Sequence, residues 1–189
     1  MVRLVHSVVP ALAAVGALAA VFAVPAVLDA VIPTRETALA AGTEITLTAS
    51  GVGAVHGGAD PADAVTFALP EPMHRVATGS DSAAVFRSDI ADQRLAVSVV
   101  DGITDFDTAA PRLLLPLKAA GRTVNFDGGV LDVGSFHGLT CVLPDTAGGV
   151  CAVATSGDIA VTLTVAGPTR EAGLALIRSV LETGKAVQA

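Results

Sequence analysis

The clearest pattern of secondary structure in the chain lies in GLTCVLPDTAGGVCAVATSGDIAVTLTVAGPTREAGLALIRSVL, residues 138–181. Its first part holds three runs rich in Val, Leu, Ile and Thr, at 138–143, 149–155 and 158–166. Turn residues separate these runs, which is the pattern of consecutive β-strands joined by short connections. We therefore expect three strands that follow one another directly.

An amphipathic helix follows these strands. Pro168 opens it, and Gly184 comes directly after its end. Apolar residues recur at intervals that place them on one face, which can cover a sheet. These residues are Leu174, Ile177, Val180 and Leu181.

The chain has two cysteines, Cys141 and Cys151, on either side of VLPDTAGGV. If the turn is centred near Thr146, the two cysteines lie directly opposite each other on neighbouring strands, close to bridging distance. Their spacing is not C-x-x-C, and no histidine lies nearby at a zinc-finger interval. We predict a structural Cys141–Cys151 disulfide, with redox activity and metal binding as the alternatives.

Strand-like runs and one helical window precede this segment. The strand patterns occupy 43–49, 64–70, 83–88, 94–100, 122–126 and, more briefly, 128–134. The order of strands, helix, strands and helix predicts an α+β fold, in which one helical layer covers an antiparallel sheet.

The helical window contains two prolines. Asp107 can cap its N-terminus, and Pro111 suits the first turn. Gly121 ends the helix, while Pro116 lies inside it and costs helix stability. We therefore expect a short or kinked helix.

The N-terminus carries the uncharged stretch VVPALAAVGALAAVFAVPAVL, residues 8–28. As a helix it spans about 30 Å, the thickness of the hydrocarbon core of a bilayer. Arg3 precedes the span and Asp29 follows it, so the positive-inside rule places the N-terminus in the cytoplasm. The alternative is a signal peptide cleaved at the A-x-A sequence of 38–40.

These features predict a single-pass protein of the plasma membrane. The predicted parts are a transmembrane anchor at 1–32, a linker at 33–42 and an extracytoplasmic α+β domain at 43–189. An oxidising compartment outside the cytoplasm would allow the disulfide to form.

The net charge of the chain is −7, and it has neither Trp nor Tyr. An acidic surface repels phosphate backbones, so we predict no nucleic-acid partner. Anionic lipid headgroups would not attract such a surface either. The missing aromatic residues exclude stacking platforms for sugars or bases that use Trp or Tyr.

No known catalytic or cofactor motif is present. The histidines His6, His56, His74 and His137 are spread over the chain. Asp101, Asp105 and Asp107 in DGITDFD could face a hard cation, but a strand-to-helix turn is the preferred reading. P-loop and dinucleotide fingerprints are absent. We therefore predict no metal and no cofactor.

The segment GSFHG, residues 134–138, contains the residue types of a nucleophile elbow in a different order. Ser135 and His137 would share one face of a strand. If the protein is a hydrolase, these two residues are its candidate catalytic residues.

The order of elements, with GLTCV, GVCAV, IAVTLTV and PTREAGLALIRSVL, resembles small single-pass envelope proteins of actinobacteria, some of which are associated with type VII secretion. The helices flanking the strands also resemble the Mog1/PsbP-like fold of accessory and binding proteins. The resemblance covers residues 76–183 and carries over no functional residue. The cysteine pair and the absence of Trp and Tyr depart from it.

These observations favour a non-catalytic accessory or interaction protein of the cell envelope, held at the membrane by its anchor. It would meet an envelope protein partner, in a secretion or envelope complex. A lipid- or small-ligand-binding module is the first alternative, because a sheet with a helical layer can enclose an apolar pocket. An envelope hydrolase is the second.

Overall fold

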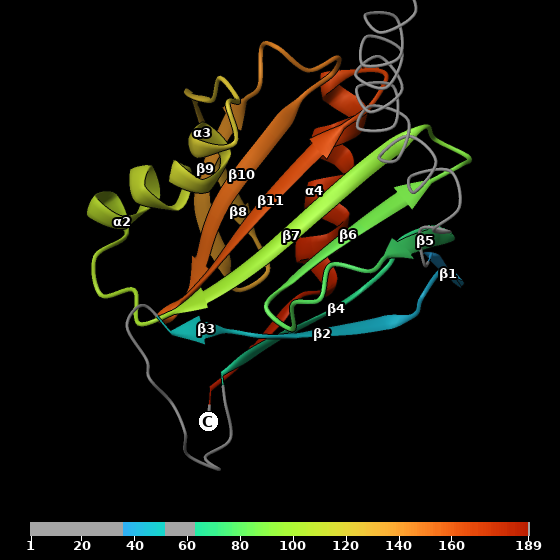
Figure 1. The fold of residues 1–189 in the computed structure, drawn as a ribbon. Coiled ribbons are helices and arrows are strands. Elements are labelled where there is room, and N and C mark those ends of the chain that lie inside the picture. Colours follow the sequence, from blue (N-terminus) through green and yellow to red (C-terminus); the bar gives the residue numbers. More distant parts are fainter. Residues whose placement is uncertain (1–35, 52–62, 189) are drawn as a thin grey trace, which may run out of the picture. The chain divides into compact units, whose positions relative to one another are not determined.

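A computed structural model describes residues 36–51 and 63–188 (Figure 1). The predicted membrane span at 8–28 lies outside these residues. Within the described ranges, no helix has the length and the hydropathy that crossing a membrane requires.

The centre of the fold is a sheet of nine strands, antiparallel apart from the short β3 (Figure 1). Eight strands follow in the order β1 (Glu36–Leu39), β5 (Met73–Val76), β6 (Ala83–Ser88), β7 (Gln93–Asp101), β11 (Ile159–Ala166), β10 (Val150–Ser156), β9 (Phe136–Val142) and β8 (Asn125–Val133). The ninth, β3 (Ser50–Gly51), pairs with the end of β7. The strands predicted within 138–166 are therefore consecutive neighbours, as expected.

A second, three-stranded sheet has the order β12 (Lys185–Val187), β4 (Ala64–Ala68) and β2 (Glu44–Thr48). It packs on the same core as the large sheet, where the rings of Phe67 and Phe86 meet edge to face at 6.1 Å. The sequence predicted the strands β2 and β4 but not this separate sheet.

The helices lie on opposite faces of the large sheet (Figure 1). Helix α4 (Arg170–Thr183) packs against β10, β11 and β4. Helices α2 (Phe106–Leu113) and α3 (Leu115–Ala119) cover the other face. The fold is α+β as predicted, but the expectation of one helical layer is wrong.

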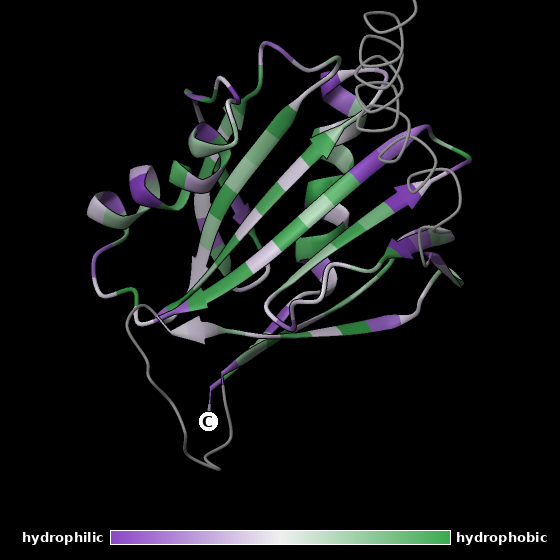
Figure 2. Ribbon diagram, in the orientation of Figure 1, coloured by the Kyte–Doolittle hydropathy of each residue, from purple (hydrophilic) through white to green (hydrophobic). Residues whose placement is uncertain are grey.

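The alternation along β10 explains how one sheet carries two cores. Val150, Ala152 and Ala154 point toward α4, while Cys151 and Val153 point toward α2 and α3. All five are fully buried, because successive strand residues face opposite sides and both sides are covered. Figure 2 shows hydrophobic residues along the central strands and on α4.

The helical window differs from its prediction in detail. Asp105 caps α2, and Asp107 lies in the first turn. Pro111 lies inside α2, while Pro116 stands at the start of α3. Pro116 therefore marks the division of the window into two short helices, because it removes a backbone donor that a continuous helix would use.

The range predicted as a linker, 33–42, contains strand β1, which pairs with β5. Strands β5 and β12 were also not predicted. All three are short strands of three or four residues, and β1 and β12 find their partners in distant parts of the chain. Local sequence patterns are weakest for such strands.

A substitution at Gly173 tests the contact between α4 and the sheet. A Cβ at Gly173 would lie 2.6 Å from Cγ2 of the buried Val150. Alanine normally stabilises a helix interior relative to glycine by about 1 kcal/mol, but overpacking a core costs about 1–3 kcal/mol. We therefore expect Gly173→Ala to lower the free energy of unfolding, measured by urea denaturation.

The exposed Ala175 of the same helix provides the control. Ala175→Gly should cost about 1 kcal/mol from helix propensity alone. An increase in the free energy of unfolding on Gly173→Ala would contradict the close contact between α4 and β10.

Candidate functional site

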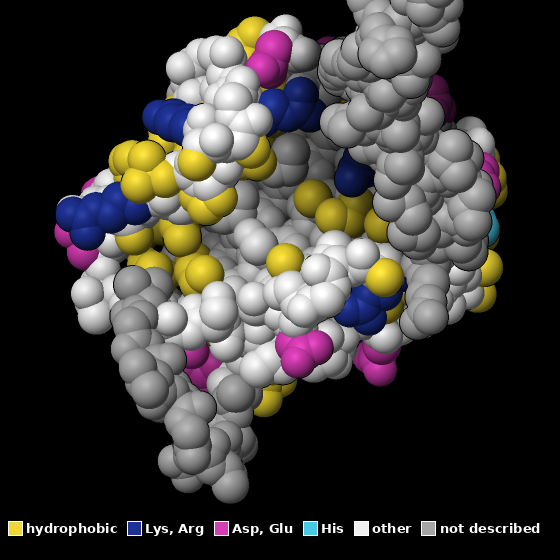
Figure 3. Space-filling model, in the orientation of Figure 1, with side chains coloured by type: hydrophobic (Ala, Val, Ile, Leu, Met, Phe, Trp, Pro, Cys, Tyr) yellow, Lys and Arg dark blue, Asp and Glu magenta, His cyan; other side chains and the backbone are white. Residues whose placement is uncertain are grey.

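The face of the large sheet that carries α2 and α3 is only partly covered. These helices lie over β9 and β10, and the described part of the chain places no helix over β6 and β7 (Figure 1). We call the half-exposed side chains on this side the open face; they are Ala83, Val85, Ala96, Ser98, Val100 and Thr164. Figure 3 shows this side hollowed between α2–α3 and the edge strands. Its small side chains leave room for another molecule.

A cavity of about 330 Å³ lies beside α2, where β7 leads into the helix. We call it the α2 cavity; its walls are Gly102, Ile103, Thr104, Asp105, Thr108, Ala109, Arg112 and Leu113. Most of its lining is apolar, and Asp105 and Arg112 supply charges of opposite sign. Its volume falls at the lower end of the range for small-molecule sites, about 300–1,000 Å³.

Two aspartates of DGITDFD belong to the start of α2: Asp105 is its N-cap and Asp107 lies in its first turn. Asp105 Oδ2 accepts a hydrogen bond of 2.6 Å from the Thr108 hydroxyl, and Oδ1 accepts one of 3.4 Å from the Thr108 backbone amide. The hydroxyl bond is the main reason why the pKa of Asp105 lies below its usual value. Asp105 is thus occupied as a helix cap.

The predicted disulfide joins Cys141 and Cys151, which are directly opposed on β9 and β10 with Cα atoms 4.8 Å apart. Both cysteines are fully buried beneath α2 and α3. With a sequence separation of 10, closing the loop stabilises the fold by about 2–3 kcal/mol. The bond is consistent with an oxidising, extracytoplasmic compartment.

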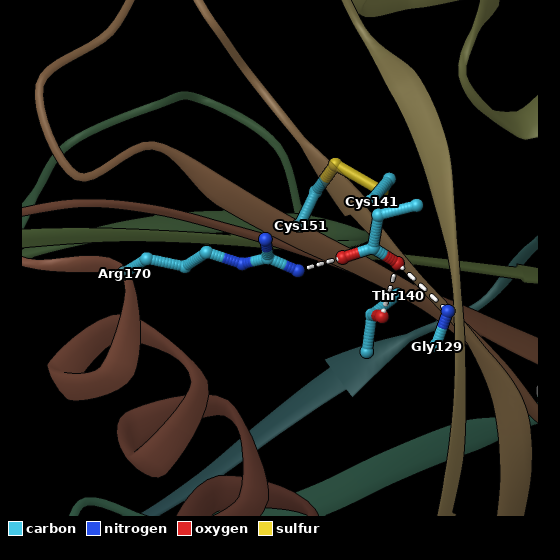
Figure 4. The surroundings of a disulfide bond; sticks show 6 residues. Gly129, Thr140, Cys141, Cys151 and Arg170 are labelled. Atoms are coloured by element: carbon cyan, nitrogen blue, oxygen red, sulfur yellow. Dashed lines mark hydrogen bonds and ion pairs between the residues drawn. A yellow bond between two sulfur atoms is a disulfide. The ribbon is translucent and has the colours of Figure 1, made fainter.

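On the other side of the same hairpin, Asp127 links three elements (Figure 4). Its Oδ1 accepts hydrogen bonds from the Thr140 hydroxyl at 2.6 Å and from the Gly129 amide at 2.9 Å. The guanidinium of Arg170, the first residue of α4, contacts Oδ2. We call this group the Asp127 clamp, because it joins β8, β9 and α4.

The Asp127 side chain is only 10% exposed. Burial alone would raise its pKa, but the hydrogen bonds from Thr140 and Gly129 and the charge of Arg170 outweigh this effect. The net pKa of Asp127 therefore lies below its usual value. The sequence analysis missed this residue; the only local signal was the turn sequence Asp127–Gly129 within a strand pattern.

Ser135 and His137 lie close together in the sequence, at the turn between β8 and β9 and at the start of β9. Ser135 is exposed at the turn between β8 and β9. The Nδ1 atom of His137 lies 3.0 Å from Oδ1 of Asp132, and both side chains are more than two-thirds exposed. In the described part of the chain, no hydrogen bond joins Ser135 to His137, and neither residue lines the α2 cavity.

His74 belongs to a charged cluster at the other edge of the sheet. Its Nε2 lies 3.2 Å from Asp89, and Arg87 bridges Asp89 at 3.2 Å and Glu36 at 3.3 Å. The contact to Glu36 ties β1 to the sheet. His137 is on β9, and four strands separate β9 from β5 in the sheet order.

His6 and His56 lie outside the described residues, as does any site that would include them. Across 36–51 and 63–188, no three side chains of His, Cys, Asp or Glu gather closely enough to hold a metal ion.

Comparison with known protein families and with curated proteins gives no match for this chain. The features of this domain that could bind another molecule are the open face, the α2 cavity and the surface of α2 and α3.

We expect the Asp127 clamp to make the stability of the fold depend on pH. Because the folded pKa is lowered, the stabilisation is complete above the unfolded pKa of about 3.9 and is lost as pH falls through the folded value. We expect Asp127→Asn to lose about 1–3 kcal/mol at pH 7, the usual value of buried hydrogen bonds to a charged group.

Urea denaturation of wild type and variant at several pH values checks this expectation. The difference between them should shrink once the pH falls below about 3.9. Asp132→Asn is the matched control, since Asp132 is 73% exposed on the same strand and should change stability by no more than about 0.5 kcal/mol. A difference that stays constant down to low pH would contradict the assignment.

Proposed function

We propose that this chain is a non-catalytic accessory protein of the cell envelope, anchored in the plasma membrane by residues 8–28. In this proposal the N-terminus is cytoplasmic and the domain is extracytoplasmic, where it meets an envelope protein partner through the open face. The observation that supports it best is a sheet face with small, half-exposed side chains beside helices that cover only its other part.

The position of β1 supports a close tether. Seven residues, 29–35, separate the predicted span from Glu36. Even fully extended they reach about 25 Å, at no more than about 3.6 Å per residue. An anchored domain would therefore remain next to the bilayer, where its partners would be other envelope components.

The buried disulfide is compatible with this location, and the fold arrangement supports the proposed relation to Mog1/PsbP-like domains of actinobacterial envelope proteins. The supporting features are a large antiparallel sheet and an amphipathic helix that follows three consecutive strands.

Ala96 on the open face allows a direct test in intact cells. We expect the full chain to remain with the membrane after alkaline washing, and both cysteines to resist alkylation until reductant is added.

A cleavable cross-linker should give one discrete adduct with an envelope protein. Ala96→Arg should abolish the adduct, because a large cation on the open face blocks close packing.

The matched control is Ala175→Arg, on the exposed side of α4, which should keep the adduct. Unchanged thermal unfolding of both variants excludes misfolding as the cause. Recovery of the chain in the cytosol, or an adduct that survives Ala96→Arg, would contradict the proposal.

The α2 cavity supports a second candidate function, the binding of a small, mainly apolar ligand. Its lining is mostly apolar, and Arg112 could pair with an anionic group. Ala109→Trp should fill the cavity, while Ala119→Trp on exposed α3 should not.

Mass spectrometry of small molecules extracted from the purified full chain checks this function. We expect a compound that is stoichiometric in wild type and in Ala119→Trp but depleted in Ala109→Trp. Equal recovery from all three proteins, or none from any, would exclude the cavity as a ligand site.

A further inference from the structure

Beyond the exposed Asp107 in the first turn of α2, the outward side of α2 and α3 combines apolar and basic side chains. We call this surface the α2–α3 patch; it consists of Pro111, Arg112, Leu115, Pro116, Lys118 and Arg122, all exposed. The opposite side of the same helices is buried, with Ala110 and Leu114 each 1% exposed. Leu115 is 55% exposed although it neighbours Leu114. The two sides of this segment therefore differ sharply in their surroundings.

The charge of this segment is opposite to that of the chain. Residues 108–126 contain three basic side chains and no acidic one, whereas the net charge of the chain is −7. Among the described ranges, this is the longest stretch without Asp or Glu. Figure 3 shows Lys and Arg side chains beside the hydrophobic ones over α2 and α3, with acidic side chains at the margins of this region.

The patch is held rigidly by the core beneath it. Leu114 and Ala110 pack on the disulfide and on Val153. The side chains of the patch therefore project from a fixed base, and contact with another surface costs little conformational freedom of the backbone.

We propose that the α2–α3 patch is a second membrane contact, in which Arg112, Lys118 and Arg122 bind phosphates of anionic lipids and Leu115 enters the headgroup region. Basic residues near a bilayer are attracted by anionic lipid, and exposed Leu is typical of interfacial helices. This inference rests on the proposed anchoring. It modifies the expectation that an acidic chain is not drawn to anionic lipid, since the attraction here is local.

A lipid surface fits the patch better than an acidic protein. A tether of about 25 Å keeps the bilayer within reach at all times, so even a weak contact forms readily. The contact of the patch with lipid would then determine which side of the domain faces the membrane. It would also determine the direction in which the open face points.

The two native cysteines are joined to each other, so one introduced cysteine can be labelled selectively. We would reconstitute the full chain carrying Leu115→Cys, labelled with the environment-sensitive dye NBD, into vesicles. On vesicles of equal parts phosphatidylcholine and phosphatidylglycerol, we expect emission to shift to the blue and to rise at least about twofold relative to pure phosphatidylcholine. Lipids with a spin-label quencher should reduce it.

Ile90→Cys is the matched control, because Ile90 is 76% exposed but lies between Asp89 and Asp92 in the β6–β7 turn. Its label should report water on both kinds of vesicle. Combining Arg112→Gln, Lys118→Gln and Arg122→Gln with Leu115→Cys should abolish the response. Arg178→Gln with Lys185→Gln, which removes exposed cations elsewhere, should not.

Flotation of the same vesicles separates the two proposals. A chain that floats with the vesicles while position 115 reports water overturns the second contact and leaves the anchoring intact. An equal response on pure phosphatidylcholine, or at Ile90, also overturns the second contact. A chain that does not float with either vesicle overturns the anchoring itself.

Discussion

The central strands are buried on both faces, and this double burial dictates where the helices must pack. In β10, alternate residues face α4 on one side and α2–α3 on the other, and none of them contacts solvent from Val150 to Ala154. A strand of this kind is stable only if each face has a cover, because leaving either side exposed would return a continuous apolar surface to water. The helices therefore sit on opposite faces of the sheet.

The hairpin of β9 and β10 contacts both helical layers. On one side it carries the disulfide, which cross-links the two strands in the buried core beneath α2 and α3. On the other side, Thr140 helps to hold Asp127, which in turn contacts the first residue of α4. The two helical layers are thus attached to neighbouring residues of the same strand. This gives α2–α3 a fixed position although neither helix is long enough to be stable alone.

Because α2 and α3 are short, they cover only part of their face, and the uncovered part and the cavity at the base of α2 follow from that fact. The proposed functions all concern this side of the molecule. The open face would meet a partner, the α2 cavity a small ligand, and the α2–α3 patch the lipid surface. A contact of the patch with lipid would orient the open face, so that anchoring and recognition would be linked through one rigid hairpin.

The sequence by itself determined the local features: the strands at 138–166, the opposed cysteines, and α4 with its apolar stripe, which depend on spacings within a few residues. Tertiary structure decided the rest. Strands β1 and β12 exist because distant segments supply their partners, and Asp127 meets Arg170 only because the fold brings residues 43 positions apart together. The face on which α2–α3 packs was likewise undetermined, since a strand that is apolar on both sides offers two equivalent surfaces to the first helix that follows it.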